Sequence, residues 1–144
     1  MPDERTTAAY AALLLRVSMG AMFLAHGALL KLGTFGLAGT MGYFGSLGYP
    51  PVLGALVTFA EILGGIALIL GIWVRPVSLL FLPIMLGALA QHAGNGWLFS
   101  AKGGGWEFPA FWTAALLVQA GLGAGAFALA PRRPRGTDSA AAMA

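Results

Sequence analysis

The chain has 144 residues, of which 58% are hydrophobic and only 9% are charged, and it contains no cysteine. Water-soluble domains carry roughly a quarter of their residues as charged side chains, and disordered chains are poor in apolar residues, so both classes are excluded. The net charge of +3 forms no basic stripe, which excludes nucleic acid as a partner. The lack of cysteine excludes thiolate chemistry and Cys-ligated metal centres. The lipid bilayer is the remaining solvent, and an all-α membrane protein is expected.

Four apolar segments are long enough to cross the bilayer as helices that rise about 1.5 Å per residue. They cover residues 8–30, 51–72, 76–92 and 108–130. Prolines stand near the start of the last three, where the first helical turn tolerates a missing N–H, while Pro83 lies inside the third and should bend it. We predict one transmembrane domain over residues 1–131, a membrane-spanning four-helix bundle, followed by a polar, disordered cytoplasmic tail at 132–144.

The distribution of basic residues predicts the orientation of the bundle. Four spans put both termini on one side, and that side carries Arg5, Arg75 and three further arginines after residue 131. The opposite side carries only Lys31 and Lys102. The positive-inside rule therefore places both termini in the cytoplasm, N-in and C-in.

Between the first two spans, glycine recurs at every third position from Gly33 to Gly48. A collagen strand would need proline at the intervening positions and three chains in water. Apolar side chains stand at helical spacing from Leu37 to Leu47, which predicts a short Gly-rich helix at the outer interface, packed closely through its glycines. A flexible hydrophobic loop is the alternative, because glycine supports helices poorly.

Two charged residues fall deep inside the predicted spans. Counting along each helix places Arg16 and Glu61 near the bilayer midplane, with Gln119 at a similar depth. A lone charge there costs about 2.5–3.5 kcal/mol, so we predict an Arg16–Glu61 ion pair, with Gln119 as a third, ligand-binding member. Two roles stay open for the pair: a catalytic proton relay or ligand anchor, or a purely structural lock on the helix register.

A second group of polar residues gathers at the outer end of the predicted bundle. It comprises His26, Lys31, His92, Trp106 and Glu107. Histidines on two helices are the minimum for a bis-histidine haem, but hydrogen-bonded histidines are the commoner case, and no metal site is predicted. We favour a polar pocket in which His26, His92 and Glu107 handle the protons of a membrane-soluble quinone. Lys31, Trp106 and Glu107 are its ligand-binding candidates.

Several short motifs follow one another along the chain from about Leu14 to Leu129. They are Leu15-Arg16, His26-Gly27 with Lys31, Phe44, Leu47-Gly48 and Pro50, Glu61 with Gly64-Gly65, Leu70-Gly71, Arg75, His92, Asn95-Gly96 and Gly105-Trp106-Glu107. Together they resemble the DoxX family of four-helix bacterial integral membrane proteins. The resemblance implies a multi-pass protein of the bacterial inner membrane, and it puts Arg16, His26, Glu61, His92 and Glu107 at family motif positions.

The resemblance also implies a membrane component of an oxidoreductase complex that exchanges electrons or protons with quinone. The family includes a subunit of an archaeal thiosulfate:quinone oxidoreductase and a mycobacterial membrane partner of a superoxide dismutase and a thiosulfate sulfurtransferase. A soluble redox enzyme is thus the expected partner, and whether this chain is itself catalytic stays open. The alternative is a non-catalytic anchor or assembly factor. A small-molecule transporter ranks lower, because four spans would need a homo-oligomer to form a pathway.

Overall fold

The computed structural model describes residues 3–129, and this part of the chain is built from helices and loops without a strand. The elements are α1 (Glu4–Leu24), the π-helix η1 (Ala25–Thr34), α2 (Gly36–Ser46), α3 (Pro51–Leu70), α4 (Val74–His92), the short 3₁₀ turn η2 (Ala93–Asn95) and α5 (Glu107–Leu122). The all-α prediction is confirmed. The predicted tail at 132–144 lies outside the described residues.

Three helical stretches are long and apolar enough to cross a membrane: α1 continued by η1, α3, and α4 continued by η2. The fourth predicted span, 108–130, is helical only as far as Leu122, because Gly123 and Gly125 adopt positive φ angles of 79° and 69° and end the helix. The 16 residues of α5 extend about 24 Å at the helical rise, less than the ~30 Å of a hydrocarbon core. The fourth span and the topology therefore remain predictions.

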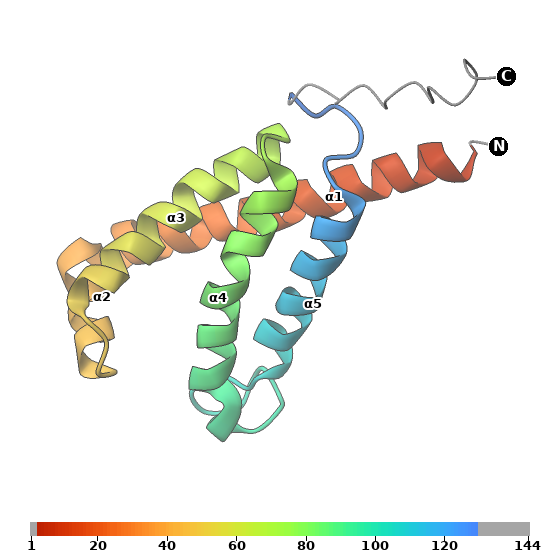
Figure 1. Cartoon of the computed structure of the whole chain (residues 1–144). Helices are drawn as coiled ribbons and strands as arrows, with labels where there is room; N and C mark the ends of the chain where they lie inside the picture. Colours follow the sequence, from red (N-terminus) through yellow and green to blue (C-terminus); the bar gives the residue numbers. More distant parts are fainter. Residues whose placement is uncertain (1–2, 130–144) are drawn as a thin grey trace, which may run out of the picture.

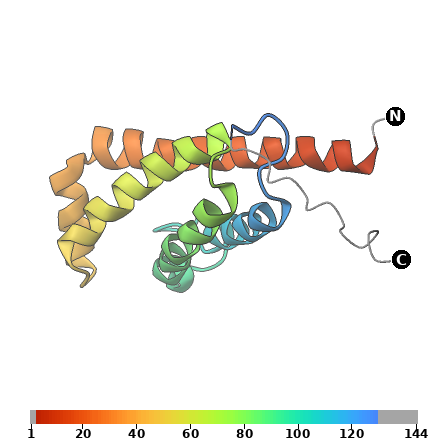
Figure 2. The same cartoon turned by 45° about the horizontal axis from the view of Figure 1, so that its top comes forward.

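The helices form two arms that meet near the turn between α3 and α4 (Figure 1). One arm holds α1 with η1, α2 and α3, and the other is the α4–α5 hairpin. Figure 2 shows α1 and α3 side by side in one layer, with the hairpin in a second layer. Contacts between α3 and α4 are few, so the arms diverge away from the turn.

The apolar core lies where the two arms meet. Phe23 of α1 stacks on Phe81 of α4, with ring centroids 3.7 Å apart, and its centroid lies 4.7 Å from that of Trp112 on α5. Leu68 and Leu116 are fully buried in the same cluster. Aromatic and aliphatic burial thus joins α1, α3, α4 and α5 at one point.

Large apolar side chains also face outward on the long helices. Leu14 on α1, Leu63 on α3, Leu80 on α4 and Phe111 on α5 are 64–74% exposed. A soluble monomer rarely exposes contiguous apolar surface on all its helices, whereas lipid tails solvate such side chains. These faces are suited to lipid.

The short helix predicted from the glycine-rich segment is confirmed as α2, and the loop alternative is wrong. Thr40 is buried on α2, while Leu37 and Leu47 are half-buried. A Cβ at Gly54 of α3 would lie only 3.1 Å from the Cα of Met41, so the two helices approach closely there. Packing against α3 compensates for the low helix propensity of glycine.

Two glycines let α1 and α3 cross backbone to backbone. A Cβ at Gly65 would lie 2.8 Å from the carbonyl oxygen of Gly20 and from the amide nitrogen of Leu24, and a Cβ at Gly20 would lie 2.7 Å from the carbonyl oxygen of Gly65. Further along, a Cβ at Gly27 of η1 would lie 2.9 Å from the carbonyl oxygen of Thr58. The two helices therefore run antiparallel in a fixed register.

We expect Gly65→Ala to lower the free energy of unfolding by about 1–3 kcal/mol, because the added methyl group must push two backbones apart. Thermal or denaturant unfolding in detergent measures this loss. Gly121→Ala is the matched control, since a Cβ at this helical position meets no atom within 4 Å. Equal stability of the two variants would show that the crossing is looser than described.

Candidate functional site

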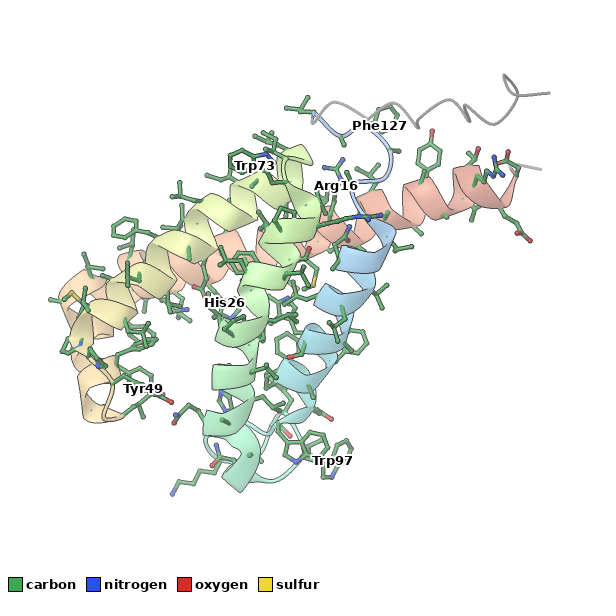
Figure 3. All side chains as sticks on the ribbon, in the orientation of Figure 1. Arg16, His26, Tyr49, Trp73, Trp97 and Phe127 are labelled. Atoms are coloured by element: carbon green, nitrogen blue, oxygen red, sulfur yellow. The ribbon has the colours of Figure 1, made fainter. Side chains whose placement is uncertain are left out.

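The predicted Arg16–Glu61 ion pair is wrong. The Arg16 guanidinium lies against the C-terminal end of α3, where Nη1 donates to the carbonyl oxygens of Leu68 (3.2 Å) and Ile69 (2.9 Å). Its Nη2 donates to the carbonyl oxygen of Ala126 in the segment after α5, at 2.7 Å. Arg16 of α1 therefore joins the end of α3 to the segment after α5, and Figure 3 shows it where the two arms meet.

The error came from the depth assigned to Arg16. The first helical stretch runs without a break from Glu4 to Thr34, 31 residues in all, and is longer than a bilayer core. The distance of Arg16 from the start of this stretch therefore does not give its depth in the bundle. In the antiparallel register Glu61 lies opposite the stretch around Gly27, about 16 Å along α1 from Arg16.

Glu61 instead forms a salt bridge with Lys31, with Nζ and Oε2 2.6 Å apart. The two side chains are only 16% and 6% exposed. A buried charge must be compensated, and each of these two charges compensates the other. Lys31, which the sequence placed at the interface, thus reaches inward to the carboxylate that the sequence placed at mid-membrane.

The π-helical winding of η1 explains how Lys31 reaches this position. Phe35 N donates to Leu30 O at 3.0 Å, the five-residue spacing typical of a π-helix. Residues five apart lie about 140° apart around an α-helix, but they lie on the same face of a π-helix, where residues i and i+5 are joined by a hydrogen bond. His26 and Lys31 are separated by five positions, so η1 turns both toward the same cavity.

The cavity lies between the two arms and has a volume of about 980 Å³. Its wall is mostly apolar, with a smaller set of side chains that carry polar groups: His26, Lys31, Thr40, Tyr43, Tyr49, Glu61, Gln91, His92 and Trp112. Gln91 Nε2 on α4 donates to the Tyr49 hydroxyl at 3.3 Å, which links the arms at the far end. In Figure 3 the labelled His26 lies in the angle between the arms, and Tyr49 lies toward the α2 end.

In both histidines the ring nitrogen Nδ1 is hydrogen-bonded to backbone carbonyl oxygen. His26 Nδ1 lies 2.9 Å from Met22 O, and His92 Nδ1 lies 3.1 Å and 3.0 Å from the carbonyl oxygens of Gly103 and Gly104. A carbonyl oxygen only accepts, so each Nδ1 carries the proton and Nε2 is the acceptor of the neutral ring. Both rings line the cavity.

The remaining sequence candidates lie outside the cavity. Glu107 Oε1 accepts from Phe99 N at 2.8 Å and orders the loop before α5, and Trp106 is 42% exposed in the same loop. Gln119 is buried, and its Nε2 donates to Gly123 O at 2.7 Å. The cavity thus brings together four of the predicted site residues, Glu61, Lys31, His26 and His92. Arg16, Gln119, Trp106 and Glu107 are not among its lining residues.

Sequence reasoning missed several lining residues, of which Thr40, Tyr43, Tyr49, Gln91 and Trp112 carry polar groups. Trp112 follows Phe108 by one helical turn, and both aromatic rings line the cavity. That spacing was the available signal, although it is equally typical of a lipid-facing aromatic belt. Within residues 3–129, no group of three or more His, Asp or Glu side chains is placed to hold a metal ion.

Comparison with known protein families identifies the family of this chain. A family model described as DoxX matches residues 11–94, the part of the chain that begins within α1 and ends in η2, just after α4. The matched segment contains Lys31, Glu61, His26 and His92, and with them most of the cavity wall. No significant match to a curated protein or to a solved structure was found.

Proposed function

The chain belongs to the DoxX family of membrane proteins, and from this premise we propose that it is the membrane component of an oxidoreductase complex and binds a membrane-soluble quinone. The observation that carries the proposal is a largely buried Lys31–Glu61 ion pair at the wall of a large, mostly apolar cavity. Small-molecule sites commonly have this form, an apolar pocket with a few convergent polar groups.

The chemistry of quinone reduction fits these side chains. The reaction adds two electrons and two protons to the quinone and produces a quinol. His26 and the Lys31–Glu61 pair carry exchangeable protons at the cavity wall. The electrons come from a soluble redox enzyme, the proposed partner of this chain in the complex.

We place the protein in the bacterial inner membrane as a multi-pass bundle. In this arrangement α5 is the fourth span, both termini are cytoplasmic, and the cavity lies in the outer half. Arg5 and Arg75 at the inner side and Lys102 at the outer side support this orientation. The short α5 then spans a locally thinned part of the bilayer.

A non-catalytic anchor or assembly factor is the second candidate. The observation that favours it is that Lys31 and Glu61 satisfy one another, while Arg16 is bonded to backbone carbonyls. Charges arranged in this way can hold helices in register without any ligand. Quinone binding separates the two functions, because an anchor needs no occupant in the cavity.

Filling the cavity tests the proposal. A Cβ at Gly87 or at Gly121 meets no atom within 4 Å, but only Gly87 lines the cavity. We expect Gly87→Phe to weaken the binding of decyl-ubiquinone by about tenfold or more, a loss of 1.4 kcal/mol, and Gly121→Phe to leave it unchanged. Binding is measured by quenching of tryptophan fluorescence in lipid nanodiscs. The absence of saturable binding, or equal affinity of both variants, would contradict the proposal.

A further inference from the structure

Trp112 carries a hydrogen-bond donor that no group in residues 3–129 accepts. The side chain is 5% exposed, and its Nε1 is buried without a partner. More than nine in ten buried polar groups in proteins have a partner, so an unpaired indole N–H calls for a reason. Trp112 also lines the cavity between the arms, where a bound molecule would lie against it.

The Trp112 ring is held on several sides. Its centroid lies 4.7 Å from Phe23, 5.2 Å from His26 and 5.4 Å from Phe108. These contacts fix the indole, so its N–H cannot turn away to find another acceptor. A phenylalanine would supply apolar contacts without burying a donor, so packing alone does not explain a tryptophan at this position.

His26 lies edge-on to the Trp112 ring and provides the complementary group. With Nδ1 donating its proton to Met22 O, the His26 ring in its neutral form presents Nε2 as an acceptor. The indole N–H, a fixed donor, and His26 Nε2, an acceptor, thus belong to two neighbouring side chains of the cavity lining. A carbonyl oxygen matches the first group, and a hydroxyl group matches both.

We infer that Trp112 is a positioning residue whose Nε1–H donates a hydrogen bond to an oxygen atom on the head of an apolar ligand in the cavity. The ligand class is an apolar molecule with a carbonyl or hydroxyl oxygen, such as a quinone and its quinol. This inference rests on the proposed function and goes further, because it names the atom that orients the ligand. The apolar remainder of the ligand then extends toward Phe44 and Tyr49.

The wild-type protein tests the inference without any substitution in the site. The chain has four tryptophans, and the other three, Trp73, Trp97 and Trp106, are 42–73% exposed and lie outside the cavity lining. In ¹⁵N–¹H spectra of the indole groups, decyl-ubiquinone should shift the Trp112 N–H proton downfield and leave the other three in place. Saturable binding with an unmoved Trp112 resonance would overturn the inference and leave the proposed function standing.

A second measurement compares two ligands in two proteins. The ligands are decyl-ubiquinone and decylbenzene, which has the same tail but no ring oxygen. We expect Trp112→Phe to reduce the preference for the quinone by about tenfold, the worth of one good hydrogen bond, while decylbenzene binds equally to both proteins. An unchanged preference in Trp112→Phe would overturn the inference. If the wild-type protein does not bind the quinone at all, this result would instead overturn the proposed function.

Discussion

Replacing Glu61 by glutamine should destabilise the protein by about 3–5 kcal/mol, because it leaves the Lys31 ammonium buried without a counter-charge. The side chain keeps its shape, so the loss reports the charge and not the packing. Lys31→Met should have a similar effect for the converse reason. In the double variant Lys31→Met/Glu61→Gln no unpaired charge remains, and most of the lost stability should return. Unfolding in detergent, followed by circular dichroism, measures all four proteins.

A second double-mutant cycle provides the control. Arg16 and Glu61 make no contact, so Arg16→Met and Glu61→Gln should have additive effects within about 0.5 kcal/mol. A coupling of several kcal/mol between Lys31 and Glu61 and none between Arg16 and Glu61 would establish the observed pairing. A large Arg16–Glu61 coupling would contradict it.

Replacing Arg16 by methionine should lower the free energy of unfolding by about 3 kcal/mol or more, because buried carbonyl oxygens at the end of α3 and after α5 lose a charged donor. Arg16→Lys should retain only part of this stability, since an ammonium group cannot donate to several carbonyl oxygens at once in the forked geometry of a guanidinium. Quinone affinity should not change in Arg16→Lys, because Arg16 lies outside the cavity lining. Unfolding and binding measurements on the same samples separate the two effects.

Arg75 offers a matched control for the Arg16 substitution. It also donates to a backbone carbonyl oxygen, that of Gly121, but at 3.4 Å and in an exposed position. Arg75→Met should therefore change the stability by no more than about 0.5 kcal/mol, as is usual for surface substitutions. If Arg16→Met were no more harmful than Arg75→Met, Arg16 would not be the tie between the arms.

The sequence was sufficient to locate most of the helices. The segments predicted at 51–72 and 76–92 correspond to α3 (Pro51–Leu70) and α4 (Val74–His92), and α2 appeared where apolar residues recur at helical spacing. These predictions rest on local signals, namely apolar length, proline near a helix start and periodicity. Local signals suffice for helices, because helical hydrogen bonds are themselves local.

The pairing of charges could not be read from the sequence, because it depends on the register between helices and on winding. Arg16 meets the end of α3 and Glu61 meets Lys31 only once the antiparallel α1–α3 crossing is known. The π-helical winding of η1 then turns Lys31 inward, and no residue pattern indicated it. The same two helices could pack with one shifted by a turn along the other, so their composition does not determine the register.

The role of Trp112 was hidden for a different reason. In a soluble protein an apolar face marks the core, but in a membrane both the core and the lipid-facing surface are apolar. Trp112 and Phe111 are neighbours on α5, yet the first is 5% and the second 74% exposed. Composition cannot separate two such positions, so the cavity wall emerges only from the packing of the arms.

Photoaffinity labelling with an azido-quinone tests the central claim most directly, since it reports where the quinone lies. We expect covalent adducts on the cavity walls formed by η1, α2, α3, α4 and α5, suppressed by excess decyl-ubiquinone and by Gly87→Phe but not by Gly121→Phe. Adducts confined to outward-facing positions such as Leu14, Leu63 and Phe111, and insensitive to competitor, would show that the quinone only dissolves in the surrounding lipid and would contradict the account.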